Sequence, residues 1–266
     1  MRPARLPPEV GQSNLWTRIP KPKLAPSLPL CRRRPRLRKS TLRERIPNRA
    51  MKLAVFDVCG TIYRSNTTYD FLAFFFRPRS KAKVLLLSAG RCLPAKVLWK
   101  SFRLFRREDW FRGIAVGLLK GTAPDEIRRE AARFVETVLE GRKIEEVGEL
   151  LRTLKEEGYE TVLMSSSLSC VVAEVAAHLG VDRFFASELE VVQGRLTGRY
   201  ADDIKGRKRE VYEKNFRGVE ELAVVTNNRE DLDLLTIADR SWIVLKRKDR
   251  GYWSRHKPPT ATPIEV

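Results

Sequence analysis

The feature that most constrains the fold is the stretch at residues 51–63, Met-Lys-Leu-Ala-Val-Phe-Asp-Val-Cys-Gly-Thr-Ile-Tyr. Its apolar run ends abruptly at Asp57, and Gly60 follows, a residue that lets the backbone turn tightly. A short apolar run bounded by turn residues is typical of a strand buried in a parallel sheet. Open α/β sheets bind their ligands at the carboxyl ends of such strands. The stretch therefore predicts a buried strand that carries a candidate nucleophile, Asp57, although an aspartate that only caps the next turn gives the same pattern.

Strand and helix patterns alternate along the second half of the chain, which is typical of a parallel sheet with helices on both faces. The hairpin pattern at 189–198 has its turn at Gln193-Gly194. We therefore predict the α/β class, with a doubly wound, Rossmann-like parallel sheet. Further strands are expected at 161–164, 184–185, 222–225 and 242–245, and helices at 144–157, 170–179, 208–215 and from 231.

Residues 70–140 lack this alternation and mix aromatic with basic side chains. We interpret them as an inserted α-helical cap domain, and assign 51–69 and 141–246 to the α/β core. Between residues 95 and 107, apolar side chains fall on one helical face and Lys and Arg on the other. Such a helix most often packs its apolar face and solvates its basic one. A peripheral contact with an anionic membrane surface, or with an anionic substrate, is the alternative.

The formal net charge of +19 is unevenly distributed. Residues 1–50 hold 14 Lys and Arg against 2 Glu, which predicts a disordered basic extension. We interpret Met51 as the natural start. The alternatives are a basic arm for nucleic acid and an Arg-rich targeting segment, and no specific nucleic-acid site is predicted. Residues 247–266 are basic and contain proline, so we expect a flexible tail.

The cysteine pattern and hydropathy exclude several classes of protein. The four cysteines are scattered, with no Cys-x-x-Cys pair, which argues against a disulfide framework and a structural zinc site. No apolar run approaches the roughly 18–20 residues that a membrane span requires. We therefore expect a cytoplasmic protein, and the sequence predicts no particular oligomeric state.

Chemically useful side chains follow several of the predicted strands. Asp57, Ser165 and the oxygen-rich loop at 226–231 all follow strands, and Lys208 begins a helix. Because the ends of parallel strands share one edge of a sheet, we expect these groups to converge. A carboxylate, a hydroxyl and a lysine suit a phosphate group, and oxygen ligands suit Mg²⁺. Each also has a simpler explanation: a solvated charge run for Lys208, and a helix N-cap for Ser165 or Asp231.

Taken together, these motifs resemble the haloacid dehalogenase superfamily, and most closely its phosphoserine phosphatase-like branch with a helical cap. The first motif, usually Asp-x-Asp-Gly-Thr, corresponds to residues 57–61, and the fourth, usually Gly-Asp-x-x-x-Asp, to residues 226–231. The second motif corresponds to 162–167, the hairpin of the branch to 189–198 and the lysine motif to 208–212.

The resemblance implies a Mg²⁺-dependent phosphomonoester hydrolase or phosphotransferase that acts on a small phosphorylated or anionic substrate through an aspartyl-phosphate. It assigns catalysis to Asp57 and Cys59. It assigns phosphate binding to Thr61, Ser165, Ser166 and Lys208. It assigns Mg²⁺ binding to Asp57, the backbone carbonyl of Cys59, Asn227 and Asp231.

Two residues depart from the usual motifs. Cys59 replaces the aspartate that normally protonates the leaving group and later activates water. A free thiol titrates near 8.5, and general acid–base catalysis contributes typically 10²–10⁴-fold, so hydrolysis is expected to be slower. Asn227 replaces an acidic metal ligand, which predicts weaker Mg²⁺ binding. Two alternatives follow: chemistry that needs no leaving-group acid, such as carbon–halogen displacement by Asp57, and a non-catalytic binding protein.

Overall fold

The central strand of the fold is β1 (Met51–Phe56). The structure is a computed structural model that describes residues 51–89, 107–181 and 183–266. All of these belong to one unit of the chain, Leu37–Val266. The other strands are β2 (Glu160–Leu168), β3 (Arg183–Val192), β4 (Arg195–Asp202), β5 (Val219–Thr226), β6 (Arg240–Leu245) and β7 (Ala261–Glu265). The α-helices are α1 (Thr67–Phe76), α2 (Lys81–Ala89), α4 (Arg107–Gly117), α5 (Pro124–Phe134), α6 (Glu145–Glu156), α7 (Ser169–Leu179), α8 (Lys208–Asn215), α9 (Leu232–Leu235) and α10 (Arg250–His256).

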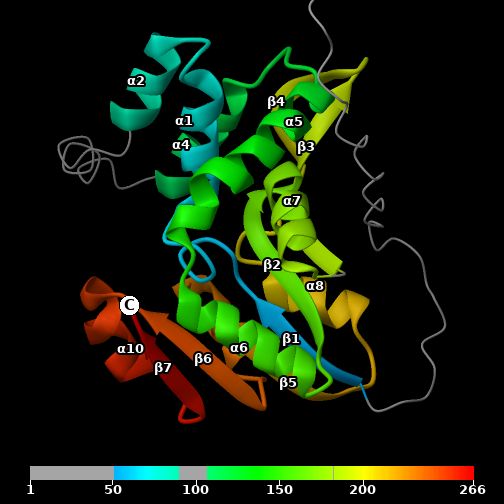
Figure 1. Ribbon diagram of the computed structural model, residues 1–266, viewed down its shortest axis with the longest axis vertical. Coiled ribbons are helices and arrows are strands. Elements are labelled where there is room, and N and C mark those ends of the chain that lie inside the picture. Colours follow the sequence, from blue (N-terminus) through cyan, green and yellow to red (C-terminus); the bar gives the residue numbers. More distant parts are fainter. Residues whose placement is uncertain (1–50, 90–106, 182) are drawn as a thin grey trace, which may run out of the picture. The chain divides into compact units, whose positions relative to one another are not determined.

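The strands form one sheet in the order β4-β3-β2-β1-β5-β6-β7. All neighbours are parallel except β3 and β4, which form an antiparallel hairpin. Figure 1 shows β1 between β2 and β5. The chain moves outward from β1 to β2 and β3, and later returns to the opposite side of β1 to form β5. The predicted doubly wound parallel sheet is confirmed, and its switch point lies beside β1.

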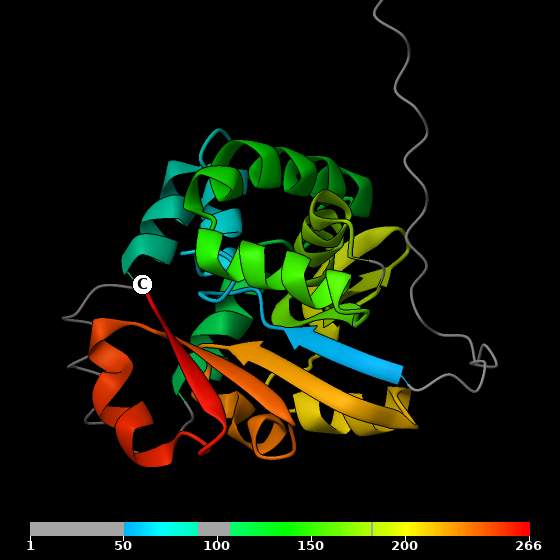
Figure 2. The same ribbon diagram turned by 60° about the horizontal axis from the view of Figure 1, so that its bottom comes forward.

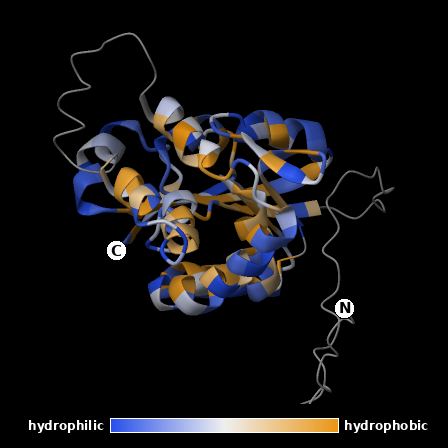
Figure 3. Cartoon of the chain, turned by 90° about the horizontal axis from the view of Figure 1, so that it is seen from above, coloured by the Kyte–Doolittle hydropathy of each residue, from blue (hydrophilic) through white to orange (hydrophobic). Residues whose placement is uncertain are grey.

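The two faces of β1 contribute to two apolar clusters. Ala54 and Phe56 belong to the cluster that contains the buried residues of α1, α6 and α7. Leu53 and Val55 belong to the other cluster, with residues of α9 and α10. Helices consequently cover both faces of the sheet, with α6 on one side and α8 and α9 on the other (Figure 2). Figure 3 shows hydrophobic residues where helices and strands face one another and hydrophilic residues on the outer faces.

The elements described between β1 and α6 are helical: α1, α2, α4 and α5, with α5 continuing as a π-helical turn at Val135–Leu139. We call these four α-helices the helical insertion. Aromatic rings pack within it, with ring centroids 5.6 Å apart for Phe71 and Phe134 and 5.5 Å apart for Tyr69 and Phe111. The boundaries of a separate cap domain at 70–140 stay a prediction. The amphipathic helix expected near 95–107 falls largely outside the described residues, as does the extension at 1–50.

The hairpin turn lies where the sequence predicts it. Gln193 and Gly194 both have positive φ, 48° and 73°, which two-residue hairpin turns of this hand require. The strand before the turn is longer than predicted, because the segments expected at 184–185 and 189–192 form one continuous β3. No helix among the residues that the structure describes is long and apolar enough to cross a membrane.

The prediction of a flexible tail at 247–266 is wrong. This segment forms α10 and then β7, which pairs with β6 from Ser241↔Ala261 to Leu245↔Glu265. Its high content of basic side chains and proline concealed an apolar anchor, the fully buried Trp253. Pro263 is tolerated within β7 because this strand lies at the edge of the sheet, where one row of backbone groups needs no ladder partner.

Replacing Trp253 by Ala should lower the free energy of unfolding by about 3–5 kcal/mol, because it leaves a large cavity in the core. Trp253→Phe should lose less, because it keeps an aromatic ring and the indole N–H has no hydrogen-bond partner among the described residues. Chemical denaturation of the full chain measures both. Leu85→Ala is the control, since Leu85 is a large apolar residue that is 70% exposed. Equal small losses for Trp253→Ala and Leu85→Ala would show that α10 is not anchored in the core.

Candidate active site

A buried ion-pair triad lies at the carboxyl edge of the sheet. Asp57 directly follows β1, and its backbone N–H donates to the carbonyl of Val225 at 2.9 Å. Lys208, the first residue of α8, places its Nζ 2.7 Å from Asp57 Oδ1 and 2.7 Å from Asp231 Oδ2. At most 4% of any of these three side chains is exposed. The structure thus brings together the predicted nucleophile, the predicted lysine and the predicted acidic residue of the last loop.

The charges of the three residues in this triad affect one another. Burial alone would lower the pKa of Lys208, but the carboxylates of Asp231 and Asp57 outweigh burial and raise it above its usual value. Burial raises the pKa of Asp57, and the ammonium of Lys208 opposes that rise. The lysine is therefore a fixed positive charge at neutral pH. Removing it would leave two buried carboxylates without compensation, which typically costs about 3–5 kcal/mol.

Threonine hydroxyls hold the last loop against the triad. Thr61 Oγ1 accepts a hydrogen bond from the Asn227 backbone N–H at 2.9 Å, and lies 3.1 Å from both Asp57 Oδ2 and Asn227 Oδ1. Thr226 Oγ1 donates to Asp231 Oδ2 at 2.6 Å. Thr61 is a predicted phosphate ligand, whereas Thr226 lies in the predicted fourth motif at 226–231 but was given no role of its own.

Cys59 occupies a second polar cluster, formed with the start of α1 and the end of β2. Its thiol is hydrogen-bonded to Thr67 Oγ1 and lies 3.8 Å from Ser165 Oγ. Thr67 in turn donates to Ser167 Oγ at 2.7 Å. Burial, together with the negative charge of Asp57, raises the pKa of the Cys59 thiol. The thiol therefore stays protonated at neutral pH, so it has a proton to give. The hydroxyl of Thr67 was not predicted, and Ser167 was given no role although it lies in the predicted second motif at 162–167.

Arg112, which sequence reasoning also missed, connects the helical insertion to this edge of the sheet. Its guanidinium is buried, forms an ion pair with Asp203 and donates to the Ser166 carbonyl. It also donates to Ser187 Oγ at 3.1 Å. The predicted phosphate ligand Ser166 is half-buried, and its backbone is held by this arginine. In the sequence, Arg112 was one of many basic residues in a charged segment, so nothing distinguished it.

A second lysine approaches the first motif from the end of β6. Gly60 has a φ of +79°, and a Cβ added to it would lie 2.5 Å from Lys246 Nζ and 2.6 Å from Asn227 Nδ2. A side chain at this position would have to displace both groups. Burial and the neighbouring charge of Lys248 lower the pKa of Lys246, whereas Asp249, Asp57 and Cys59 act in the opposite direction. Sequence analysis placed Lys246 at the boundary of the core and gave it no role.

The donor types at this edge fit the Mg²⁺ that the resemblance implies. Carboxylate, amide and carbonyl oxygens from Asp57, Asn227, Asp231 and Cys59 are the hard ligands that this ion prefers. Their negative charge is low, because Lys208 already pairs with both carboxylates. Among the described residues, no group of three or more His, Cys, Asp or Glu side chains is placed to hold a metal ion. We therefore expect the ion to bind weakly.

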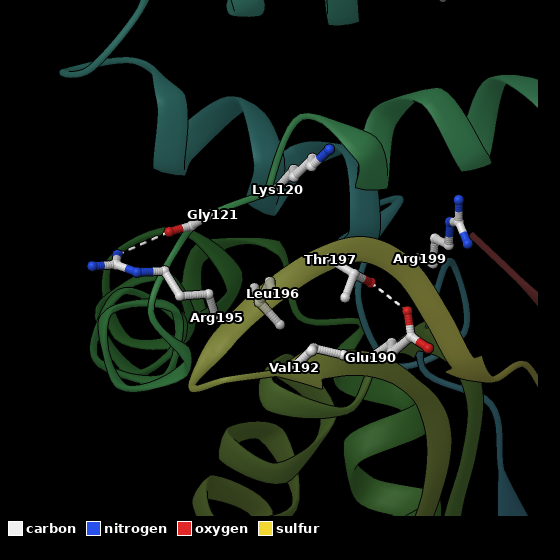
Figure 4. A pocket seen from close by; sticks show the side chains of 8 residues that line it. All are labelled: Lys120, Gly121, Glu190, Val192, Arg195, Leu196, Thr197 and Arg199. Carbon is white, nitrogen blue, oxygen red and sulfur yellow. Dashed lines mark hydrogen bonds between the residues drawn. The ribbon is translucent and has the colours of Figure 1, made fainter.

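A pocket with a volume of about 420 Å³ lies between the β3–β4 hairpin and the loop after α4 (Figure 4). Arg195 Nη1 donates to the Gly121 carbonyl at 3.0 Å, and Thr197 Oγ1 donates to Glu190 Oε2 at 2.6 Å. The remaining charged residues of the lining are Lys120 and Arg199. None of the lining residues belongs to the loops around Asp57. The candidate chemistry therefore belongs to the Asp57 edge.

Comparison with known proteins agrees with this geometry. The sequence model of the family described as haloacid dehalogenase-like hydrolases matches residues 54–236. This range covers the second half of β1, the helical insertion and the loop that carries Asp231. The chain therefore belongs to the haloacid dehalogenase-like hydrolase family.

Two curated relatives are both phosphoserine phosphatases. The one from Archaeoglobus fulgidus is 42% identical over 108 residues, which are 41% of this chain and 28% of that protein. The one from Streptomyces coelicolor is 41% identical over 58 residues, which are 22% of this chain and 14% of that protein. The matches thus span less than a third of the length of either relative.

Solved structures share the fold. A protein with unknown function from Bordetella pertussis Tohama I has a TM-score of 0.65 and 18% identity, over 78% of this chain and 96% of that one. A phosphoserine phosphatase solved as a phospho-aspartyl intermediate analogue has a TM-score of 0.56 and 19% identity, over 82% of this chain and 95% of that one. At these identities the likeness concerns the fold.

Arg112→Met should lower the free energy of unfolding by about 1.5–3 kcal/mol, the usual range for hydrogen bonds to a charged group. Arg128→Met is the matched control, because Arg128 lies in the same insertion and its ion pair with Asp125 is largely exposed. We expect this control to lose less than about 1 kcal/mol. Urea unfolding at neutral pH measures both variants. If they lose the same amount, the buried contacts of Arg112 do not hold the insertion to the sheet.

Proposed function

We propose that this chain is a phosphomonoester hydrolase or phosphotransferase in which Asp57 is the nucleophile. The observation that carries the proposal is the position of Asp57: a buried carboxylate at the carboxyl end of the central strand, paired with Lys208. A nucleophile in that place can be reached by a ligand bound at the switch point of the sheet. Family membership and the two phosphoserine phosphatase relatives support the same reaction class.

Substrate binding would use Lys208 and Thr61, which contact Asp57, and the serines at the end of β2. The ammonium of Lys208 would neutralise charge on the phosphoryl group, and the hydroxyl of Ser165 would donate to a phosphoryl oxygen. Thr61 and Ser166 are the further candidate ligands. The relatives support a small phosphorylated compound as the substrate.

The chemical step would run through Asp57. One carboxylate oxygen attacks phosphorus, the ester P–O bond breaks, and the leaving alkoxide takes the proton of the Cys59 thiol. In the second half, water attacks the phosphorus of the aspartyl-phosphate and gives a proton to the Cys59 thiolate. Phosphate leaves, and both side chains return to their starting forms. When the acceptor is another alcohol, the same scheme describes a phosphotransferase.

Mg²⁺, when held by Asp57, Asn227, Asp231 and the carbonyl of Cys59, would supply further neutralisation of phosphoryl charge. Within the chain itself, Lys208 supplies a fixed positive charge at the nucleophile. Thr61 and Thr226 keep the loop at 226–231 in place around that charge.

Asp57→Asn should lower turnover of a phosphomonoester at least about 100-fold, because the amide keeps the size of the side chain and removes the attacking charge. Phosphate release from a generic aryl phosphate measures it, and circular dichroism checks the fold. Asp125→Asn is the control, because Asp125 is largely exposed on the insertion. Turnover near the parent level in Asp57→Asn would remove Asp57 from the mechanism. Release of halide from a haloacid, with no phosphate release, would favour the dehalogenase alternative.

Cys59→Asp should raise turnover of an alkyl phosphate by about 10²-fold, because a carboxyl is the better proton donor to a poor leaving group. Turnover of an aryl phosphate should change much less, since its leaving group needs little protonation. Cys59→Asn is the matched control, with the same shape and no acid. Initial rates on both substrates give the ratio of alkyl to aryl phosphate turnover for each variant. Equal changes for alkyl and aryl substrates would contradict the assignment of residue 59 as the leaving-group acid.

A further inference from the structure

Two nitrogen groups meet beside Gly60, at the first motif. Lys246 Nζ and Asn227 Nδ2 both lie within 2.6 Å of the point where a Cβ on Gly60 would sit. An ammonium and an amide N–H₂ group are hydrogen-bond donors, so together they favour an anion at this point. The family pattern places an acidic side chain at residue 227, and that group would favour a cation instead.

Lys246 has no partner of its own in the described part of the chain. No side-chain hydrogen bond or ion pair joins its Nζ to any described residue, although it lies half-buried at the end of β6. It lines a pocket of about 440 Å³ together with Arg64 and Val266. Arg64 is exposed and likewise forms no side-chain ion pair with the described residues. Two positive charges thus border a space beside the first motif, and neither forms an ion pair with a described residue.

The balance of charge around Asp57 also favours the binding of an anion. The two carboxylates, Asp57 and Asp231, are matched by two ammonium groups, Lys208 and Lys246. Acidic residues at 59 and 227, as in the usual motifs, would add two negative charges to this edge. A phosphate dianion would then be repelled unless a metal ion were present. With Cys59 and Asn227, the edge has no excess negative charge.

We infer that Lys246 is a phosphate-binding residue of the Asp57 site, whose ammonium, with the Asn227 amide, holds a phosphoryl oxygen without the help of Mg²⁺. The inference rests on the proposed function and deepens it. Lys208 binds from the triad, and Lys246 binds from the side of Gly60 and Asn227. The substitution at residue 227 and the lysine at the end of β6 are then complementary parts of one anion site.

Calorimetric titration of the full chain with inorganic phosphate in excess EDTA tests this inference. The parent should bind phosphate, and Lys246→Met should weaken binding about 10- to 100-fold, as expected for a lost charge-assisted hydrogen bond. Lys246→Arg should retain most of the affinity. Lys248→Met is the matched control, because it removes the same charge from an exposed position two residues away. Lys246→Gln repeats the test with a polar side chain, in case Met disturbs the fold.

Mg²⁺ titration without phosphate supplies a second readout. Asn227→Asp alone should gain little Mg²⁺ affinity, because the new carboxylate would pair with Lys246. Combined with Lys246→Met, it should gain about tenfold or more, which exceeds the product of the two single effects.

Three results would overturn the inference: phosphate binding by the parent only when Mg²⁺ is present, equal phosphate affinity in Lys246→Met and Lys248→Met, or additive effects on Mg²⁺ binding. The proposed function fails separately. If phosphate binding depends on Lys246 but no phosphomonoester is turned over, the anion site stands without the catalytic proposal. If turnover depends on Asp57 but phosphate affinity does not depend on Lys246, the catalytic proposal stands without the anion site.

Discussion

The ammonium of Lys208, buried between Asp57 and Asp231, is the interaction on which the rest of the site depends. It joins the end of the central strand, the start of α8 and the turn after β5, at 2.7 Å to each carboxylate. Burying three charges is unfavourable unless the pairing is close, so the three segments must keep their positions. Thr61 and Thr226 then complete the hydrogen bonding of the two carboxylates. The triad is both the electrostatic centre of the site and a constraint on the loops around it.

The sheet makes this triad possible. Phe56 of β1 is in register with Leu163 of β2 and Val225 of β5, so the residues that follow these strands reach the same edge. Apolar side chains on both faces of β1 pack into the two clusters, so this strand is buried between the helices on either side of the sheet. The helical insertion is joined to the same edge through Arg112, which donates to the backbone at Ser166. The packing of β1, the register of the strands and the geometry of the site are therefore linked in this fold.

Cys59 and Asn227 have a physical consequence beyond the loss of two acidic groups. Each removes a negative charge from a place where the fold concentrates charge, and Lys246 adds a positive one beside them. A site with these residues attracts cations less strongly and anions more strongly than one with the usual acidic residues, although its backbone follows the same fold. Cys59 is also drawn into a network of hydroxyls with Thr67 and Ser167, so its thiol is oriented as well as buried.

The sequence by itself determined the fold class and the convergence of Asp57, Lys208 and Asp231 at one edge of the sheet. These follow from apolar runs and from residues that directly follow them, which are local patterns. Only the tertiary structure decided the surroundings of Arg112 and Lys246 and the fold of the segment at 247–266. Arg112 and Lys246 are two of 52 lysines and arginines, and nothing local separates a buried one from a solvated one. Trp253 likewise anchors α10 only because residues of distant strands form the cluster that receives it. Such roles depend on contacts between segments far apart in the chain, and a local pattern cannot contain them.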